Sequence, residues 1–329
     1  MIGTLARVRR GLYALGAIRS ESLPRPVVSI GNLTVGGSGK TPHVMFVASW
    51  LTGMGVKVAV LSRGYGRRSR GVVWVSHGEG PVVTASVGGD EPVLLAASLP
   101  GVPVLVAESR AEAGRECLRR REVDAFLLDD GYQHLSLRRD ADILLVDAGR
   151  GLGNRRTLPF GPLRESPRSA RFADALIVTK CAGLPEGEAV ADGIPFPLGR
   201  PRACTRLVPR SVVDRDGRET PLPTGAEEVT AFSGLARNEP FSDTLREAGY
   251  VVRKFIGFGD HHAYRTRDVE RILAAAGGMP VMTTEKDLVR LPADLKFEVK
   301  ALRVGVEFLA GWEAVSGLVL GRLARPEQS

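Results

Sequence analysis

The sequence contains few cysteines, few aromatic residues and no long apolar run. Cys117, Cys181 and Cys204 are far apart and odd in number, so we expect neither a disulfide framework nor a C-x-x-C metal site, and a reducing compartment is favoured. Aromatic residues make up 6% of the chain and do not interleave with a basic stretch, which argues against a stacking surface for single-stranded nucleic acid. No run reaches the ~18 apolar residues of a membrane span. No convincing signal-peptide cleavage site follows the apolar residues 12–18.

Positive charge exceeds negative charge, and the chain is long enough for two domains. Lysine and arginine total 45 against 37 aspartate and glutamate residues, which gives a formal charge of +8. This balance favours anionic partners such as nucleic acid, anionic lipid headgroups or phosphorylated small molecules, and it does not choose among them. At about 150 residues per domain, the chain length predicts roughly two domains. Two domains can enclose a cleft.

The first twenty residues predict a basic amphipathic helix. Apolar side chains recur at spacings of three and four and fall on one stripe: Ile2, Leu5, Val8, Leu12, Leu15 and Ile18. Arg7, Arg9, Arg10 and Arg19 lie mainly off that stripe. Such a helix can lie in a membrane interface with its arginines near acidic headgroups. Alternatively, it can dock on the core of its own protein.

Short apolar runs alternate with helical patterns from residue 26 onward. This alternation predicts a mostly parallel sheet sandwiched by helices. The expected strands are 27–30, 56–61, 72–75, 102–106, 123–128, 143–146 and 175–179, and the expected helices are 40–54, 92–98 and 111–121. A proline- and glycine-rich region at 183–209 and a hairpin-like segment at 211–220 follow. We place the junction between two domains there.

A second, smaller α/β unit is predicted beyond the junction. Its expected strands are 229–232, 251–255 and 280–283, and its expected helices are 240–248, 267–276 and 312–323. The predicted organisation is an N-terminal helix at 1–25, a larger α/β domain at 26–200, and a smaller α/β domain at 201–329 that begins with a β linker.

The stretch TVGGSGKT at 34–41 nearly spells a phosphate-binding loop. The pattern G-x-x-x-x-G-K-[ST] is met except at its first glycine, where Thr34 stands. A strand before the glycines and a helix after them would point backbone N–H groups at an anion. The expected nucleotide-binding residues are Thr34, Val35, Gly36, Gly37, Ser38, Gly39, Lys40 and Thr41. Lys40 would reach the β and γ phosphates and Thr41 would hold Mg²⁺. The alternative is a glycine-rich connection without a ligand.

Two adjacent carboxylates, Asp129 and Asp130, end the strand predicted at 123–128. They lie at the edge where α/β sheets bind ligands, and a P-loop enzyme needs an acidic group there to organise its metal. Because two adjacent carboxylates repel each other, a cation between them and the phosphates is expected. The alternative is an Asp-Asp-Gly turn without a ligand.

Polar clusters also follow other strands, and each of them alone is a weak signal because caps and solvated turns have the same composition. In chain order they read SRGYGR, GGDEP, ESR, QH, GPLRE, GDHHAY and TTEKD. Together with GNLTVGGSGKTP and DDGYQH, these motifs closely resemble the tetraacyldisaccharide 4'-kinase family of Gram-negative bacteria. The resemblance extends from the N-terminal helix to Asp287, and the threonine at the first loop position agrees with the form of that family.

The resemblance implies an ATP-dependent kinase with a P-loop NTPase-type sheet and a smaller domain joined by a β linker. Its acceptor would be the 4'-hydroxyl of an acylated glucosamine disaccharide 1-phosphate, and its product the 1,4'-bisphosphate precursor of lipid A. ATP and Mg²⁺ are the expected cofactors. The expected location is the cytoplasmic face of the bacterial inner membrane, with peripheral attachment through the N-terminal helix. Neither nucleic acid nor an obligate protein partner is expected.

The resemblance also assigns roles to single residues. Asp90 is the expected base, with His261 as its partner, although His262 is adjacent; His261 is favoured because it directly follows Asp260. Such a pair would span both domains and make domain closure a condition for catalysis. Arg110 is expected to neutralise the transferring phosphate. The metal set is Thr41, Asp129, Asp130 and Glu165, and the residues expected to line the site are Tyr65, Gln133, His134, Arg164 and Asp260.

Two other classes of function compete with this interpretation. A soluble P-loop GTPase or metallochaperone-like switch is suggested by Thr179-Lys180 after a strand, which resembles part of the guanine-reading T/N-K-x-D motif. Position 182 is alanine where that motif has aspartate, so the match is poor. A nucleic-acid-binding protein is suggested by net charge alone and predicts salt-sensitive binding.

Overall fold

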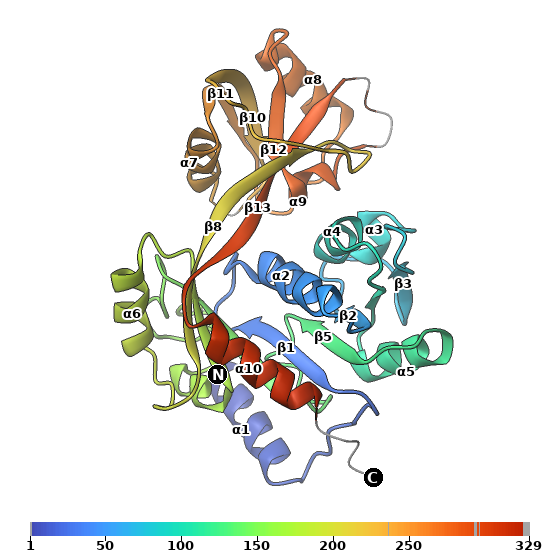
Figure 1. Ribbon diagram of the computed structural model, residues 1–329, viewed down its shortest axis with the longest axis vertical. Helices are drawn as coiled ribbons and strands as arrows, with labels where there is room; N and C mark the ends of the chain where they lie inside the picture. The colour runs from blue at the N-terminus through green and yellow to red at the C-terminus, as the bar shows by residue number, and fades with distance from the viewer. Residues whose placement is uncertain (1, 236, 293–294, 296, 325–329) are drawn as a thin grey trace.

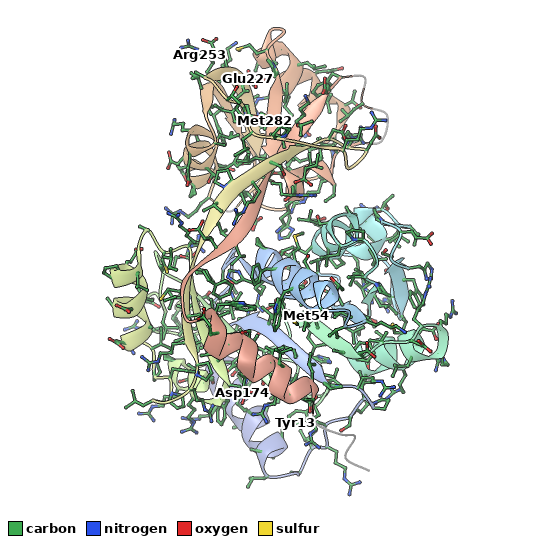
Figure 2. All side chains as sticks on the ribbon, viewed as in Figure 1. Tyr13, Met54, Asp174, Glu227, Arg253 and Met282 are labelled. Carbon is green, nitrogen blue, oxygen red and sulfur yellow. The ribbon has the colours of Figure 1, made fainter. Side chains whose placement is uncertain are left out.

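The computed structural model describes residues 2–235, 237–292, 295 and 297–324. Two α/β units are joined through one continuous sheet of thirteen strands (Figure 1). Side chains fill the space between sheet and helices in both units (Figure 2).

The first unit contains a nearly all-parallel sheet in the order β3-β4-β2-β5-β1-β6-β7-β8, in which the β3–β4 pair is antiparallel. Its strands are β1 (Val27–Asn32), β2 (Val58–Ser62), β3 (Val73–Ser76), β4 (Val104–Val106), β5 (Ala125–Asp129), β6 (Ala141–Asp147), β7 (Ala175–Thr179) and β8 (Arg202–Val213). All seven strands predicted up to residue 179 are therefore present. Both faces of β1, β5 and β6 are buried, which is why these strands read as continuous apolar runs.

Helices cover both faces of this sheet. They are α1 (Ile2–Ala14), α2 (Lys40–Gly53), α3 (Ala85–Gly88), α4 (Asp90–Ser98), α5 (Arg110–Arg120) and α6 (Leu184–Asp192), with a 3₁₀ turn η1 (Pro167–Phe172). Val47 of α2 and Leu95 of α4 pack in one core cluster with Val28 of β1. Cys117 of α5 packs in a separate cluster with Phe126 of β5. The mostly parallel sheet sandwiched by helices is thus confirmed.

The second unit continues the sheet with β10 (Glu227–Ser233), β11 (Tyr250–Gly257), β12 (Val281–Thr284) and β13 (Val299–Ala310), which are parallel to one another in the order β11-β10-β12-β13. Its helices are α7 (Glu239–Glu247), α8 (Thr266–Ala276) and α9 (Glu285–Leu288). Phe232 and Ile272 lie in one core cluster, and Val229 and Leu245 lie in another. The unit therefore has its own two-sided core.

The two units are connected by the antiparallel pair β8–β13, which runs from one unit into the other (Figure 1). The short strand β9 (Glu219–Thr220) pairs with the end of β8 and forms the predicted hairpin. After β13, α10 (Trp312–Leu323) returns to the first unit. Trp312 packs on Phe46 and Trp50 of α2, with ring centroids 5.0 and 4.8 Å apart. The division at residue 200 thus assigns α10 to the smaller domain, whereas its side chains pack on the larger one.

Several elements were not predicted from the sequence. The region 183–209, expected to be irregular, contains α6 and the start of β8. Pro185 is tolerated in α6 because it lies in the first turn. Gly187 is required where the helix approaches β8, since a Cβ there would lie 2.5 Å from the Cys204 sulfur. Strand β13 was also missed, because its apolar alternation is interrupted by Arg303 and Glu307, which pair with side chains of other elements.

Candidate active site

The phosphate-loop segment joins β1 to α2, as the sequence predicts. Gly36 and Gly39 have φ values of +102° and +77°, a region that favours glycine. No side chain caps the start of α2, so its first N–H groups remain free to bind an anion. The side chain of Lys40 is 9% exposed and its ammonium lies 3.8 Å from Asp130 Oδ1. The loop therefore has the backbone shape and the cation of a phosphate site.

Neighbouring strands hold the loop in place. Asn32 Nδ2 donates to Ser38 Oγ at 2.7 Å, and Thr179 Oγ1 donates to the Ser38 carbonyl at 2.9 Å. Lys180 donates to the Gly37 carbonyl and also pairs with Asp147 at 2.8 Å. Thr179-Lys180, which resembled part of a guanine-reading motif, thus supports the phosphate loop.

Thr34 replaces the usual first glycine of the loop without distorting the backbone. It forms an isolated antiparallel bridge with Leu163, and the N–H of Val35 donates to the Pro162 carbonyl at 2.8 Å. Thr34 is absent from the residues with positive φ, so this position does not need glycine.

A buried histidine, missed in the sequence, connects the loop with the linker. His43 Nδ1 donates to the Gly39 carbonyl at 2.7 Å, and its Nε2 lies 3.0 Å from Thr205 Oγ1 on β8. Because Gly39 offers only an acceptor, the proton is on Nδ1 and Nε2 accepts from Thr205. Burial lowers the pKa of His43 to about 4, so the ring is neutral at physiological pH.

Asp129 and Asp130 end β5 beside the loop. Ser62 Oγ donates to Asp129 Oδ2 at 3.0 Å, and Arg164 donates to Asp130 Oδ2 at 2.7 Å. Burial, followed by the negative charges of Glu91 and Asp130, raises the pKa of Asp129 to about 7. For Asp130, burial acts against ionisation, but Lys40 and Arg164 outweigh it and the pKa is lowered. The pKa values of the two adjacent carboxylates are therefore shifted in opposite directions.

Two oxygens of this acidic pair lack a hydrogen-bond donor. Asp129 Oδ1 and Asp130 Oδ1 are buried without a hydrogen-bond partner among the described residues. Such atoms are costly to bury unless a ligand meets them. No group of three His, Cys, Asp or Glu side chains in the described part of the chain forms a metal site by itself. A cation here would therefore complete its shell with phosphate oxygens and water, as Mg²⁺ commonly does.

Arg110 and His134 form a second buried cluster beside the acidic pair. Arg110 Nη1 lies 3.1 Å from His134 Nδ1. Burial and the neighbouring Arg110 and Arg139 lower the pKa of His134 to about 3, so the neutral ring accepts from Arg110. Burial, followed by Arg63, lowers the pKa of Arg110 to about 10. Arg110 Nε has no partner among the described groups, which leaves a donor for an anion.

Gln133 links the acidic pair to β1. Its Nε2 donates to the Asn32 carbonyl at 2.9 Å, and its Oε1 accepts from Arg164 at 3.3 Å. The sequence-predicted residues Gln133 and Arg164 thus lie beside Asp130.

Glu165 lies in a different environment from the one expected of a metal ligand. Both of its oxygens accept from Arg10 of α1 at 3.0 Å, and the Glu165 and Arg10 side chains are 6% and 9% exposed. This geometry argues against Glu165 as a direct metal ligand. It also corrects the expectation for Arg10, which is buried and paired within the protein and so cannot face lipid headgroups.

Asp90 and His261 meet between the two units. Asp90 opens α4, and its Oδ2 lies 2.9 Å from His261 Nδ1. The His261 and Asp90 side chains are 37% and 19% exposed. His261 has a φ of +56°, and its N–H donates to Asp260 Oδ1 at 3.0 Å. The ring of Tyr65 lies 5.8 Å from the His261 ring, centroid to centroid. The structure thus brings Tyr65, Asp90, Asp260 and His261 together.

The adjacent His262 faces away from this pair. Its Nε2 lies 3.1 Å from Asp268 Oδ2 on α8, and its ring lies 4.7 Å from that of Phe258. The preference for His261 over His262 therefore agrees with the geometry.

Three polar residues that carry no role in the sequence analysis also lie at this junction. Arg290 donates to Asp90 Oδ2 at 2.6 Å, Asp287 contacts Arg290 at 3.2 Å, and Lys286 pairs with Glu91 at 3.2 Å. The TTEKD motif contains Lys286 and Asp287 and was their only signal in the sequence. Arg290 lies outside every quoted motif. These contacts join α9 and the segment after it to α4 (Figure 1).

Comparisons with known proteins agree with this architecture. Residues 1–323 match the family described as LpxK, tetraacyldisaccharide-1-P 4'-kinase. A relative from Geobacter sulfurreducens, named tetraacyldisaccharide 4'-kinase, is 43% identical over 300 residues, covering 90% of this chain and 83% of the relative. One from Anaeromyxobacter sp. (strain K), with the same name, is 39% identical over 335 residues, covering 98% and 88%.

A solved structure extends the likeness to three dimensions. The crystal structure of LpxK from Aquifex aeolicus, described as in complex with ATP, has a TM-score of 0.82 and 34% identity, and the match covers 98% of this chain and 96% of that one. The match over residues 1–323 includes both units and α1. The chain therefore belongs to the tetraacyldisaccharide 4'-kinase family.

Proposed function

We propose that this chain, an ATP-dependent lipid A 4'-kinase by its family, uses Asp90 as the general base toward the 4'-hydroxyl of the acylated disaccharide 1-phosphate. The acceptor oxygen attacks the γ-phosphorus, the bond to the β-γ bridging oxygen breaks, ADP leaves, and the proton of the hydroxyl passes to Asp90. The observation that carries the proposal is the 2.9 Å contact between Asp90 Oδ2 and His261 Nδ1. No described residue forms a hydrogen bond or an ion pair with Asp90 Oδ1, which leaves that oxygen for the acceptor.

The phosphates are assigned to the first unit. The phosphate loop and Lys40 would hold the β and γ phosphates, and Thr41, Asp129 and Asp130 would hold Mg²⁺. The cation would neutralise charge that develops on the transferring group. The two carboxylate oxygens without donors support this assignment.

Two arginines complete the charge balance in this proposal. Arg110 has an unpaired, buried Nε, and Arg164 is already fixed on Asp130. Guanidinium groups in such positions stabilise the transition state of phosphoryl transfer.

Transfer of labelled γ-phosphate to the disaccharide 1-phosphate tests the assignment of the base. We expect Asp90→Asn to lower kcat by about 10²-fold or more, because general-base catalysis contributes about 10²–10⁴-fold, while ATP binding stays within about twofold. Asp243→Asn is the control, because it makes the same change at a carboxylate on α7 that is 72% exposed. Wild-type kcat in Asp90→Asn would rule out Asp90 as the base.

We further propose that α1 attaches the enzyme to the membrane surface that holds its lipid acceptor. Leu5 and Val8 of α1 and Leu15, which directly follows it, are 67%, 53% and 84% exposed, so the alternative in which this stripe is buried on the core is not supported. An exposed apolar stripe on a basic helix is typical of interfacial attachment. No helix in the described part of the chain is long and apolar enough to cross a bilayer.

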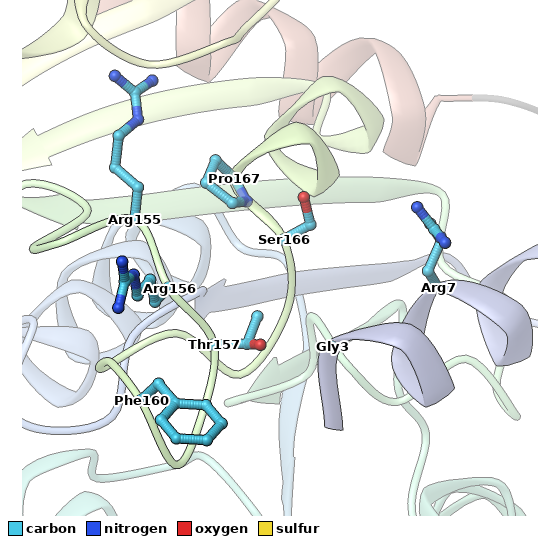
Figure 3. Close-up of a pocket in the computed structure, with 8 residues that line it drawn as sticks. All are labelled: Gly3, Arg7, Arg155, Arg156, Thr157, Phe160, Ser166 and Pro167. Atoms are coloured by element: carbon cyan, nitrogen blue, oxygen red, sulfur yellow. The ribbon is translucent and has the colours of Figure 1, made fainter. Parts of the chain in front are cut away.

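A basic pocket beside α1 also supports attachment to the membrane through this side of the protein. Its volume is about 590 Å³, and Figure 3 shows its lining from α1 and the segments around residues 155–160 and 166–167. Arg7, Arg155 and Arg156 line it, and Phe160, also in its wall, is 73% exposed. None of the described residues that line the pocket is acidic, so it is complementary to the phosphate of an anionic headgroup. The cytoplasmic face of the inner membrane is the location we propose.

Deletion of residues 1–20 should reduce binding to phosphatidylglycerol vesicles and phosphorylation of vesicle-borne acceptor, while nucleotide binding is retained. Because the deletion also removes Arg10, a second variant, Leu5→Ser with Val8→Ser and Leu15→Ser, keeps the Arg10–Glu165 pair. Leu198→Ser, which alters a side chain that is 90% exposed elsewhere, is the control. Unchanged vesicle binding by the triple variant would contradict the role of α1.

A further inference from the structure

Arg290 is a charged side chain enclosed at the junction of the two units. Its side chain is 4% exposed. Its Nε donates to Asp90 Oδ2 at 2.6 Å, and its Nη2 lies 3.2 Å from His261 Nδ1. Its Nη1 donates to the Gly234 carbonyl and to Asp287 Oδ1, both at 3.2 Å. One guanidinium therefore contacts both members of the proposed base pair.

Asp287 fixes the other side of Arg290. Asp287 is fully buried. Its Oδ1 accepts from Tyr264 Oη at 3.0 Å, and its Oδ2 accepts from Thr284 Oγ1 at 2.7 Å and from the Gly234 N–H at 3.1 Å. Burial and the neighbouring carboxylate raise the pKa of Tyr264, so its hydroxyl stays protonated and continues to donate. A carboxylate with this many donors is rigid, and it holds the guanidinium in one orientation.

We propose that Arg290 is a positioning residue for phosphoryl transfer, which holds the Asp90 carboxylate in the orientation that faces the acceptor hydroxyl. The inference rests on the proposed role of Asp90. Arg290 and His261 both contact Asp90 Oδ2, so the carboxylate is fixed through that oxygen, and no described residue forms a hydrogen bond with Oδ1. Asp90 also opens α4, and the N-terminus of a helix is a favourable place for an acidic side chain.

A neighbouring contact separates this role from that of holding the units together. Lys286 Nζ donates to Glu91 Oε1 at 3.2 Å across the same junction. The Lys286–Glu91 pair thus joins α9 to α4 without touching Asp90 or His261. If Arg290 served only to join the units, loss of either cation should have a similar effect. If it positions the base, the loss of Arg290 should act on kcat and the loss of Lys286 should not.

The test compares Arg290→Met, Arg290→Lys and the matched control Lys286→Met in the labelled-phosphate assay. We expect Arg290→Met to lower kcat by about 10²-fold, with KM for ATP within about twofold of wild type. Arg290→Lys should recover about tenfold of that loss, because an ammonium can pair with Asp90 but lacks the planar fork that also reaches His261 and Asp287. Lys286→Met should stay within about threefold of wild-type kcat.

A double variant shows whether Arg290 acts through Asp90. In the Asp90→Asn background, Arg290→Met should cause no further loss of kcat, since residues that act as a unit are not additive. An equal loss in both backgrounds, or a kcat for Arg290→Met equal to that of Lys286→Met, would overturn the proposal. Should Arg290→Met fail to fold by circular dichroism, Arg290→Lys decides: wild-type kcat in that variant contradicts the need for a fork.

The outcomes also distinguish this inference from the proposed function. A wild-type kcat in Asp90→Asn would contradict both the role of Asp90 as the base and the role of Arg290 that depends on it. A reduced kcat in Asp90→Asn together with a wild-type kcat in Arg290→Met would support Asp90 as the base and contradict only the positioning role of Arg290.

Discussion

The proposed nucleotide half of the active site lies within the first unit and is enclosed, whereas the proposed base lies between two units and is partly open. Lys40 and Asp129 are 8% and 1% exposed, and side chains of β1 and β7 hold the phosphate loop. The side chain of His261 is 37% exposed and comes from a loop of the second unit. If the proposed assignments hold, the first unit supplies the groups that bind nucleotide, and transfer depends on how the second unit sits on α4.

The largest effect is expected where the enclosed half loses its cation. Lys40→Ala should lower kcat/KM by about 10³-fold, because a preorganised charge at the transferring phosphate is lost, and ATP affinity should fall as well. The measurements are steady-state kinetics and ATP titration by calorimetry. ATP binding of wild-type strength would show that this half does not depend on its lysine.

A smaller effect, confined to chemistry, is expected from the open half. His261→Ala should lower kcat by about 10²-fold and leave ATP affinity unchanged, because no contact joins His261 to the phosphate loop. His262→Ala is the control, since His262 faces Asp268 and its loss should change thermal stability more than kcat. A parallel loss of ATP affinity in His261→Ala would mean that the two halves are not separable.

Burial of Asp129 should also make the free energy of unfolding depend on pH. Burial raises the pKa of Asp129 to about 7 from an ordinary value of 3.8. The folded state therefore holds the extra proton between about pH 4 and 7, and the free energy of unfolding falls as pH rises through that window. Asp129→Asn cannot ionise, so without Mg²⁺ its Tm relative to wild type should increase by a few degrees between pH 5 and pH 8.

Calorimetry of wild type, Asp129→Asn and the exposed-site control Asp243→Asn would measure this difference. Asp243 is 72% exposed and pairs only with Arg246 on α7. A constant Tm difference between Asp129→Asn and wild type across the window would contradict the raised pKa.

The smallest effect is expected at the unusual first loop position. Thr34→Gly should change kcat and KM for ATP by no more than about twofold, because this backbone does not need a positive φ. Gly36→Ala should be much worse, since Gly36 has a φ of +102° and a Cβ there would lie 2.7 Å from the Arg150 guanidinium. If Thr34→Gly were as damaging as Gly36→Ala, the threonine would have a role of its own.

Much of the first unit could be predicted because its strands are buried on both faces and read as apolar runs between helical patterns. The phosphate loop and Asp129-Asp130 follow such strands directly, so the spacing along the chain gives their place in space. Asp90 and His261 are 171 residues apart, and their pairing came only from the resemblance. Arg290 is an arginine after a four-residue helix, and nothing in its local sequence separates it from a solvated side chain.

The misses share a physical cause, which is dependence on a distant partner. Strand β13 is stabilised by pairing with β8, nearly a hundred residues earlier. Arg10, predicted to face headgroups, is buried because Glu165 lies opposite it. In both cases the local pattern is compatible with several environments, and the fold selects one.

The return of α10 to the first unit has a consequence for synthesis. Val315 and Val319, near the end of the chain, share a core cluster with Val28 of β1. During synthesis, the phosphate loop, Asp129 and Asp130 leave the ribosome well before α10 does. The core of the first unit is therefore incomplete until α10 has been synthesised. The smaller unit, whose strands all precede α10, can complete its own core first. The order in which the two units mature is thus expected to be the reverse of the order in which they begin.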